Sequence, residues 1–360
     1  MKQASVDPSF WQGKRVFVTG HTGFKGSWLS LWLTSMGATV KGYALAPPTH
    51  PSLFEIAGID SFLHSETADI RDFDTLRKSL LTFDPEIILH LAAQPLVRYS
   101  YREPLETYQV NVIGSLHVLE AARACNNLKA VVMVTSDKCY ENQEWEWGYR
   151  ENDQMGGRDP YSNSKGCTEL VTASYRASFF DKPTAPAIAS ARAGNVIGGG
   201  DWAQDRLIPD ALQAFTTNNP VNIRNPMAIR PWQHVLEPLG GYLVLAQHLW
   251  QHGKPYAQAW NFGPNDEDAQ TVEWILNRLT ELWGDNAHWT HEATPQPHEA
   301  HYLKLDISKA RSRLNWKPTW NLSNTLQRIV TWHQAWLAGE NMQTHCLKEI
   351  TDYQQAQSNQ

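Results

Sequence analysis

A glycine-rich turn near the N-terminus constrains most strongly how this chain can fold. The apolar run Arg15–Thr19 predicts a buried strand, and Gly26–Met36 predicts the helix that follows it. Between them, TGHTGFKG places glycines where a tight turn, a backbone approach to a pyrophosphate and close helix packing require them. The turn therefore predicts a dinucleotide-binding unit, whose candidate cofactor contacts are Gly20, His21, Gly23, Phe24, Lys25 and Gly26.

Alternating strands and helices continue through the first half of the chain. Further strands are expected at 38–45, 87–93, 130–135 and 185–193, and a long amphipathic helix at 104–124. This order predicts an α/β fold with a doubly wound parallel sheet and a smaller, mixed α/β C-terminal substrate lobe. The expected division is a cofactor domain at 1–193 with a returning segment at about 230–262, a lobe at 194–229 and 263–340, and a polar, disordered tail at 343–360.

Ionisable residues cluster after one of these strands and on the next helix. Ser136, Asp137 and Lys138 follow the 130–135 run, and Tyr161 and Lys165 lie four residues apart. That spacing puts the phenol and the amine on one helix face, where the ammonium lowers the pKa of the phenol. The phenolate could then take a proton from a substrate hydroxyl, so these five residues are the candidate catalytic group.

Composition limits the partners that the chain can have. The net charge of −6 and the lack of a basic run argue against nucleic acid, so an anionic substrate needs a local pocket of Arg and Lys. The four cysteines show no C-x-x-C spacing, and the histidines show no ligand spacing, so we expect reduced thiols and no metal. No apolar stretch reaches the length of a membrane span, and we expect a cytoplasmic protein.

Taken together, these motifs resemble the extended short-chain dehydrogenase/reductases, over about residues 14–336. The likeness rests on the glycine turn, Asp69-Ile70, His90–Ala93, Asn111 and the Tyr161/Lys165 pair. It implies that Asp69 and Ile70 contact the adenine, and that Tyr161 and Lys165 flank the nicotinamide ribose. It also implies that the backbone of Leu91, Ala92, Ala93 and Gln94 lines the cofactor. Asn111 is expected to support the sheet and the active-site helix.

One element of the cofactor site departs from the usual pattern. An Asp or Glu after the second strand normally holds the adenosine ribose, yet KGYALAPP at 41–48 contains no acid. His21 and Lys25 are expected to add positive charge instead. Either NAD is held less tightly than usual, or NADP is tolerated; we expect NAD, because no Arg follows the strand to hold a 2′-phosphate.

Within that family, nucleotide-sugar 4,6-dehydratases carry a hydroxyl residue and two ionisable residues at this strand end, usually Thr-Asp-Glu. A lysine in the third place resembles the branch that acts on CDP-glucose, as do GGGDWAQDRLIPD at 198–210 and RPWQHV at 230–235. The resemblance implies an NAD-dependent hydro-lyase that converts CDP-glucose to a 4-keto-6-deoxy sugar nucleotide and water. Such a step leads toward deoxy sugars of surface polysaccharide, including lipopolysaccharide O-antigen.

Each candidate residue then has an expected role in that cycle. Tyr161 deprotonates the C4 hydroxyl, Ser136 orients it, and Asp137 protonates the departing C6 hydroxyl, for which burial must raise the pKa of Asp137. Lys138 removes the C5 proton as a neutral amine or, alternatively, stays charged and stabilises the enolate. Expected substrate contacts are Arg98, Asn195, Arg206, Leu207, Ile208, Arg224, Arg230 and Tyr302.

Three other functions stay open at this point: a different nucleotide-sugar 4,6-dehydratase, a nucleotide-sugar 4-epimerase, and a non-catalytic NAD-sensing regulator. An epimerase needs no acid–base pair for elimination, so Asp137 and Lys138 argue against it. A regulator of this type tends to lose the Tyr or the Lys, and both are present. Helices at 104–124 and 161–180 are expected to pair across a two-fold axis, giving a homodimer or homotetramer.

Overall fold

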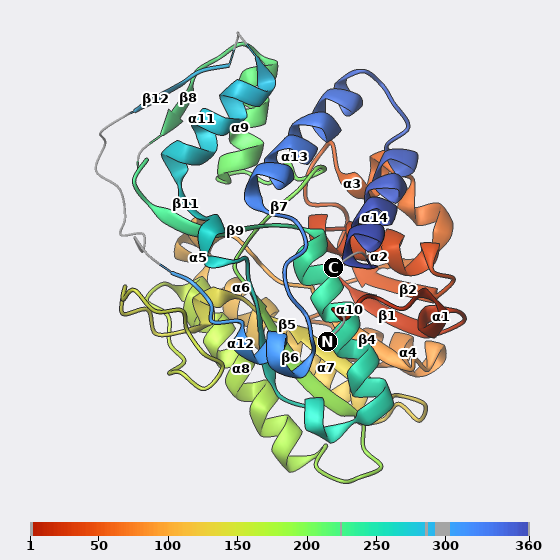
Figure 1. The fold of residues 1–360 in the computed structure, drawn as a ribbon. Coiled ribbons are helices and arrows are strands. Elements are labelled where there is room, and N and C mark those ends of the chain that lie inside the picture. Colours follow the sequence, from red (N-terminus) through yellow and green to blue (C-terminus); the bar gives the residue numbers. More distant parts are fainter. Residues whose placement is uncertain (1–2, 224, 285–286, 292–302, 359–360) are drawn as a thin grey trace.

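The computed structural model describes residues 3–223, 225–284, 287–291 and 303–358. Its larger part is a seven-stranded sheet in the order β10-β6-β5-β4-β1-β2-β3, with every neighbouring pair parallel (Figure 1). This sheet confirms the predicted fold class. Its strands are β1 (Arg15–Thr19), β2 (Thr39–Ala44), β3 (His64–Thr67), β4 (Ile87–His90), β5 (Ala130–Val134), β6 (Ala187–Ala193) and β10 (Ala259–Phe262).

Two hydrophobic cores cover the two faces of this sheet. Val16 and Val18 of β1 face one core, and Phe17 between them faces the other, because successive side chains of a strand point to opposite faces. The first core takes in α2 (Phe24–Ser35) and α10 (Leu236–His252). The second takes in α4 (Phe73–Phe83), α7 (Gly114–Ala122) and the end of α8 (Pro160–Ser178). Burial on both faces explains why these strands are almost continuously apolar.

Shorter helices connect these elements. The run expected as one helix at 104–124 is α6 (Pro104–Tyr108), a π-helical segment η2 (Gln109–Ile113) and α7 in direct succession. No helix of the described residues is both long and apolar enough to cross a membrane. The remaining short elements are α1 (Pro8–Trp11), α3 (Leu53–Ile56), η1 (Ile59–Phe62), α5 (Val97–Arg102), η3 (Asp137–Cys139) and η4 (Lys254–Tyr256).

A smaller lobe lies above the carboxyl ends of the central strands (Figure 1). Its strands form a three-stranded sheet, β11-β9-β7, and a two-stranded sheet, β12-β8. Between β9 and β11 the chain returns to the large domain, where α10 packs against β5 and β6 and β10 joins the large sheet. A third core joins its helices. The elements are β7 (Asn195–Ile197), α9 (Leu207–Thr216), β8 (Val221–Ile223), β9 (Ile229–His234), η5 (Asp266–Asp268), β11 (Ala269–Thr271), α11 (Val272–Trp283), β12 (Trp289–His291) and α13 (Leu322–Leu337). The short helix α12 (Ser308–Arg313) packs on β10 instead, with Ala310 in the first core.

The expectation of a disordered tail was wrong, because residues 342–358 form the helix α14 (Met342–Ser358). Cys346, Ile350 and Tyr353 recur on one face and are buried, and the Tyr353 ring packs edge-on against Trp32 of α2. The same face buries Glu349, whose carboxylate lies 2.9 Å from Nε2 of His234. With so few apolar residues, the sequence of this helix resembles a solvated tail.

Candidate active site

The glycine turn has the shape that a pyrophosphate site needs. A side chain at Gly20, where φ is +76°, would lie 2.7 Å from the amide nitrogen of Ala92, and one at Gly26 would lie 2.0 Å from the Gly20 carbonyl oxygen. Both glycines are therefore required by the packing of the chain itself. Gly23 is different, since its nearest contact would be an ordinary 3.5 Å. It precedes the first residue of α2, so the open backbone there fits an anionic group at the helix N-terminus.

His21 does not carry the positive charge expected of it. Its ring is fully buried against Gly42 of β2, where a side chain would lie 2.4 Å from the ring. Its Nε2 hydrogen-bonds the Ser65 hydroxyl at 2.8 Å. Burial lowers the pKa of His21 to about 4, so the ring is neutral at pH 7. His21 therefore fills the gap between the glycine turn and β2.

Lys25 points from the turn toward the catalytic residues. Its Nζ donates a hydrogen bond to the Tyr242 hydroxyl of α10 at 3.0 Å. Burial, followed by the positive charges of Lys165 and Arg206, lowers the pKa of Lys25 to about 7. The expected positive character of this residue is therefore only partial at neutral pH.

The loop after β4 is fixed on both sides. The Thr19 hydroxyl accepts hydrogen bonds from the amides of Leu91 and Ala92, both at 3.1 Å. The Asn111 side chain bonds both the amide and the carbonyl of Gln94, at 2.8 and 3.1 Å, and donates to Ser164 of α8 at 2.9 Å. Asn111 thus supports the loop and the active-site helix, as expected.

The expected adenine contacts lie after β3. Both carboxylate oxygens of Asp69 accept hydrogen bonds from Arg71, which holds the pKa of Asp69 below its usual range. With the Arg71 amide, Arg71 makes four hydrogen bonds to this carboxylate, so an adenine amine would have to share or replace one of them. Ile70 is buried against Gly114, where an added side chain would lie 2.7 Å from its Cγ2.

Ser136, Asp137 and Lys138, the triplet that follows β5, form a short, capped turn. Ser136 precedes η3, and its hydroxyl accepts a hydrogen bond from the Lys138 amide and donates one to Asp137 Oδ1 at 2.9 Å. Asp137 is only 2% exposed, and its Oδ2 has no hydrogen-bond partner among the described atoms. Burial raises the pKa of Asp137, which favours the neutral acid. Lys138 is half-buried beside it.

Tyr161 and Lys165 lie on the first turns of α8, which Asp159 caps by accepting the Ser162 amide. Both side chains are buried. Burial raises the pKa of Tyr161 to about 12, while a hydrogen bond with Ser136 opposes that rise. The expectation that Lys165 brings down the pKa of Tyr161 is therefore wrong for the protein alone. Burial also lowers the pKa of Lys165 to about 8.

The small lobe brings arginines to the same place. Arg206 lies close enough to Tyr161 to lower its pKa, and its Nη1 donates a hydrogen bond to Asp201 Oδ2 at 2.8 Å. Arg230 of β9 lies close enough to Asp137 to act on its pKa. Arg98 of α5 reaches across from the large domain to Asp205 at 2.9 Å.

The other expected substrate contacts are more scattered. Asn195 opens β7, next to the site, and Leu207 begins α9 in a half-buried position. Ile208 is buried in the third core. Arg224 and Tyr302 lie outside the described residues.

The structure adds residues that the sequence reasoning missed. Glu169 lies four residues beyond Lys165 on α8 and pairs with Arg192 of β6 at 2.9 Å, both almost fully buried. The same i, i+4 spacing that singled out Tyr161 and Lys165 could have found Glu169. Nothing local in the sequence could have found Tyr242, which meets Lys25 from 217 positions away.

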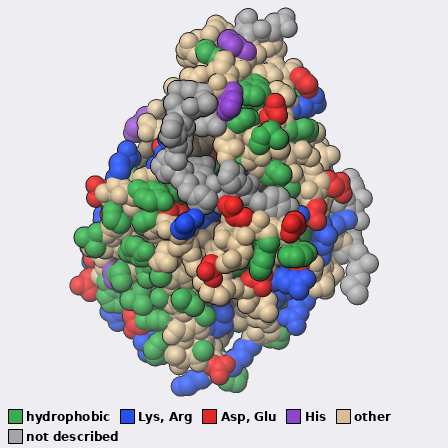
Figure 2. Space-filling model, turned by 90° about the vertical axis from the view of Figure 1, so that its left-hand side faces the viewer, with side chains coloured by type: hydrophobic (Ala, Val, Ile, Leu, Met, Phe, Trp, Pro, Cys, Tyr) green, Lys and Arg blue, Asp and Glu red, His purple; other side chains and the backbone are tan. Residues whose placement is uncertain are grey.

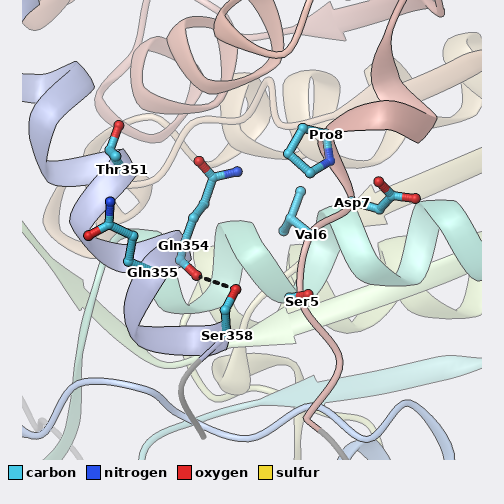
Figure 3. Close-up of a pocket in the computed structure, with 8 residues that line it drawn as sticks. All are labelled: Ser5, Val6, Asp7, Pro8, Thr351, Gln354, Gln355 and Ser358. Carbon is cyan, nitrogen blue, oxygen red and sulfur yellow. Dashed lines mark hydrogen bonds between the residues drawn. The ribbon is translucent and has the colours of Figure 1, made fainter.

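A surface groove lies away from these residues. It measures about 670 Å³ and runs between the N-terminal segment and α14, with Val6 and Pro8 facing Gln354 and Gln355 (Figure 3). None of its lining residues is a candidate catalytic residue. The described residues also contain no group of three His, Cys, Asp or Glu side chains that could hold a metal ion.

The catalytic candidates therefore meet where the sheet, α8 and the small lobe join. A buried acid, a phenol and several amines and guanidinium groups act on one another there. Such a set can move protons at adjacent carbons of a bound polyol. The glycine turn beside it fits a dinucleotide.

Comparisons with known proteins agree with this geometry. A sequence model of the GDP-mannose 4,6 dehydratase family matches residues 17–329. The chain belongs to this family. It is 61% identical over 355 residues to the CDP-glucose 4,6-dehydratase of Salmonella typhimurium, covering 98% of this chain and 99% of that protein. The predicted family resemblance is thus confirmed, including the dehydratase branch.

Solved structures share the fold of the family. A UDP-glucose 4-epimerase of Thermotoga maritima superposes with a TM-score of 0.78 at 20% identity, over 90% of this chain and 99% of that one. A dTDP-glucose 4,6-dehydratase of Bacillus anthracis, solved in complex with NAD, superposes with a TM-score of 0.73 at 19% identity, over 89% of this chain and 97% of that one. At such identities the likeness concerns the fold alone.

Proposed function

We propose that this chain is a CDP-glucose 4,6-dehydratase, a hydro-lyase that converts CDP-glucose to CDP-4-keto-6-deoxy-glucose and water. The observation that carries this proposal is the 61% identity to the Salmonella enzyme over nearly the whole of both chains. The buried acid Asp137 beside Lys138 supports elimination in particular, since epimerisation at C4 uses no such pair. The 4-epimerase and the non-catalytic regulator are therefore the weaker alternatives.

The cofactor that fits the site is NAD. The backbone at Gly23 and the N-terminus of α2 would hold its pyrophosphate, Asp69 and Ile70 would contact its adenine, and the loop at 91–94 would line it. Bound NAD supplies the hydride acceptor and, while oxidised, a positive charge beside Tyr161. No arginine lies at 41–48, in and after β2, to hold a 2′-phosphate, so NAD is favoured over NADP.

The oxidation half of the cycle falls to α8 and Ser136. Tyr161 takes the proton of the C4 hydroxyl, and Ser136, which hydrogen-bonds Tyr161, orients that hydroxyl. Because the protein alone leaves the pKa of Tyr161 at about 12, the phenol is protonated at pH 7 until positive charge arrives beside it. The product keeps the C4 ketone, so the hydride removed from C4 has to end at C6, and a proton has to return to C5.

The elimination half falls to the triplet. Asp137 stays neutral through burial and donates its proton to the departing C6 hydroxyl. We assign removal of the C5 proton to Lys138, with enolate stabilisation by the charged lysine as the alternative. Exchange of the C5 hydrogen with deuterated solvent, measured on the 4-keto compound in Lys138→Met, tests the role as base. Loss of exchange supports the base, and unchanged exchange excludes it.

Arginines of the small lobe suit the diphosphate of the substrate. Arg206 and Arg230 lie beside the catalytic residues, and a guanidinium fork matches phosphate oxygens. Arg98, Asn195, Leu207 and Ile208 stay as predicted contacts, together with Arg224 and Tyr302.

The helices next to the site suit a homodimer, or a homotetramer built from two of them. Figure 2 looks at the side of the molecule where α5, α6 and α8 lie, and hydrophobic side chains gather on its lower left part. These helices carry exposed large hydrophobic residues: Tyr101, Leu105, Ile113 on η2, and Leu170. A second copy of the chain would cover them symmetrically.

The cell context stays a prediction. We predict a cytoplasmic location and a place in the synthesis of surface polysaccharide. Both agree with the proposed product, a 4-keto-6-deoxy sugar nucleotide. Its ketone is the starting point for reduction or transamination to deoxy sugars.

The direct test is incubation of the purified protein and NAD with the glucose nucleotides of cytidine, thymidine, uridine and guanosine. Formation of a 4-keto-6-deoxy product, detected by its absorbance in alkali, is expected with CDP-glucose. An epimerised hexose without that absorbance would instead support the 4-epimerase.

A further inference from the structure

A buried carboxylate joins the helix that carries Tyr161 and Lys165 to the strand end that carries the triplet. Glu169 lies on the same face of α8 as these two residues, one turn beyond Lys165, and is only 4% exposed. Its Oε1 accepts a hydrogen bond from the hydroxyl of Thr135. Because Thr135 directly precedes Ser136, this bond connects α8 to the first residue of the triplet.

The other oxygen of Glu169 is anchored to a different strand. Oε2 accepts hydrogen bonds from the Ser190 hydroxyl at 2.6 Å and from Arg192 at 2.9 Å, both on β6. Arg192 in turn donates to the hydroxyl of Tyr140 and to the Glu151 carbonyl, so its guanidinium is fixed from several sides. Glu169 cannot swing away from this arginine without breaking a buried ion pair.

Charge keeps the carboxylate in its role as acceptor. Burial acts to raise the pKa of Glu169, but Arg192 and the hydroxyls of Ser190 and Thr135 hold it below its usual range. The side chain is therefore ionised at neutral pH and accepts all three hydrogen bonds. Among the described residues, the hydrogen bonds of Glu169 go to Thr135, Ser190 and Arg192, and none goes to Tyr161 or Lys165. Its negative charge acts to raise the pKa of Lys165, and its effect on the triplet acts through position.

The proposed reaction makes this spacing matter. Oxidation at C4 uses Tyr161 on α8, and loss of water across C5 and C6 uses Asp137 and Lys138 after β5. These carbons are neighbours in one sugar, so the two groups of side chains must be held at a fixed separation. A shift of one group by about 1 Å can cost about a hundredfold in rate. The Thr135–Glu169 hydrogen bond is a direct side-chain link between the two supporting elements.

We propose that Glu169 is a positioning residue, and that its hydrogen bond with Thr135 sets the position of Ser136, Asp137 and Lys138 relative to Tyr161 and Lys165. Glu169 and Thr135 do not touch the sugar in this role. The proposal rests on the dehydration reaction proposed above, whose two halves it connects.

The test compares two variants that each remove one hydroxyl from the same carboxylate. Thr135→Val breaks the link to the triplet, and Ser190→Ala breaks a link to β6 while Arg192 keeps its own. Both are assayed with CDP-glucose and NAD for kcat, KM and thermal unfolding midpoint. Thr135→Ser, which keeps the hydroxyl, serves as the rescue variant.

Thr135→Val is expected to lower kcat about tenfold or more with little change in KM, because a misplaced triplet affects chemistry more than binding. Ser190→Ala should stay within about twofold of the parent and Thr135→Ser should recover most of kcat, as only the link to the triplet matters. Equal kcat in Thr135→Val and Ser190→Ala at similar unfolding midpoints would overturn the positioning role while leaving the proposed function intact. A parent protein that does not dehydrate CDP-glucose would overturn both.

Discussion

Gly194 leaves the space that the carboxylate of Asp137 occupies. A methyl group added at Gly194 would lie 3.1 Å from Oδ2 of Asp137 and 2.8 Å from Cγ of Pro231. Gly194 joins β6 to β7, so the chain passes from the large sheet to the small lobe directly beside the candidate acid. The missing side chain is thus part of how the acid is accommodated.

Gly194→Ala is expected to lower kcat about tenfold or more, because Asp137 or Pro231 must move to admit the methyl group. The control is Gly263→Ala, where the added carbon would meet nothing closer than 3.5 Å. Steady-state kinetics and thermal unfolding of both variants check the prediction. A Gly194→Ala enzyme with parental kcat would show that the fit around Asp137 is not critical.

Much of the fold could be predicted from the sequence because its signals are local. The apolar strands and the turn at Gly20–Gly26 can each be recognised from a few consecutive residues. The parallel sheet confirms the predicted strands. The helix α14 could not be predicted in this way. Its buried face includes Glu349, whose partner His234 lies more than a hundred positions earlier in the chain.

The same limit applies to the electrostatics of the site. The sequence predicts that Tyr161 and Lys165 share one helix face, but it does not show how deeply they are buried. Burial disfavours the charged form of both side chains, so it raises the pKa of Tyr161 and lowers that of Lys165. His21 was expected to be charged, yet its packing against Gly42 makes it neutral. Charge states in a buried site depend on neighbours that come from distant parts of the chain.

Asp137→Asn should separate the two halves of the reaction. The amide cannot protonate the C6 hydroxyl, so loss of water should slow by about 10²- to 10⁴-fold, while oxidation at C4 continues. Reduced nicotinamide should therefore accumulate during turnover and be visible by its absorbance. Asp181→Asn, at an exposed acid on the surface, is the matched control. Full dehydratase activity in Asp137→Asn would remove Asp137 from its role as the acid.

Stability should fall as pH rises through the range in which Glu237 ionises. Burial raises the pKa of Glu237 from 4.5 to about 7, although it accepts hydrogen bonds from the amides of Thr319 and Trp320 and from Tyr353. Between these values the folded protein binds more protons than the unfolded chain, so unfolding becomes easier as pH rises from 4.5 to 7. The free energy of unfolding should fall by about 3 kcal/mol at most over this range.

Denaturant unfolding from pH 4.5 to 8 measures this dependence, with Glu237→Gln as the comparison. The variant removes the ionisation and should show a shallower slope over that range, even where its absolute stability is lower. An identical slope in both proteins would place the pKa of Glu237 near its ordinary value.

Charges on the exposed helices should break the proposed dimer. Leu105→Glu combined with Leu170→Glu adds charge to two exposed apolar positions on α6 and α8, which are in contact. We expect a monomer in sedimentation analysis, because burying two unpaired carboxylates in an interface is costly. Leu337→Glu, at an exposed leucine on α13, should leave the assembly unchanged. A parent protein that is already monomeric would contradict the proposal outright.

The path of a single hydrogen tests the central claim most directly. CDP-glucose carrying deuterium at C4 is turned over with unlabelled NAD, and the product is examined by mass spectrometry and NMR. If oxidation and reduction take place within one bound complex, the deuterium appears in the C6 methyl group of the same molecule. Deuterium recovered in free reduced cofactor, with an unlabelled methyl group, would contradict the account.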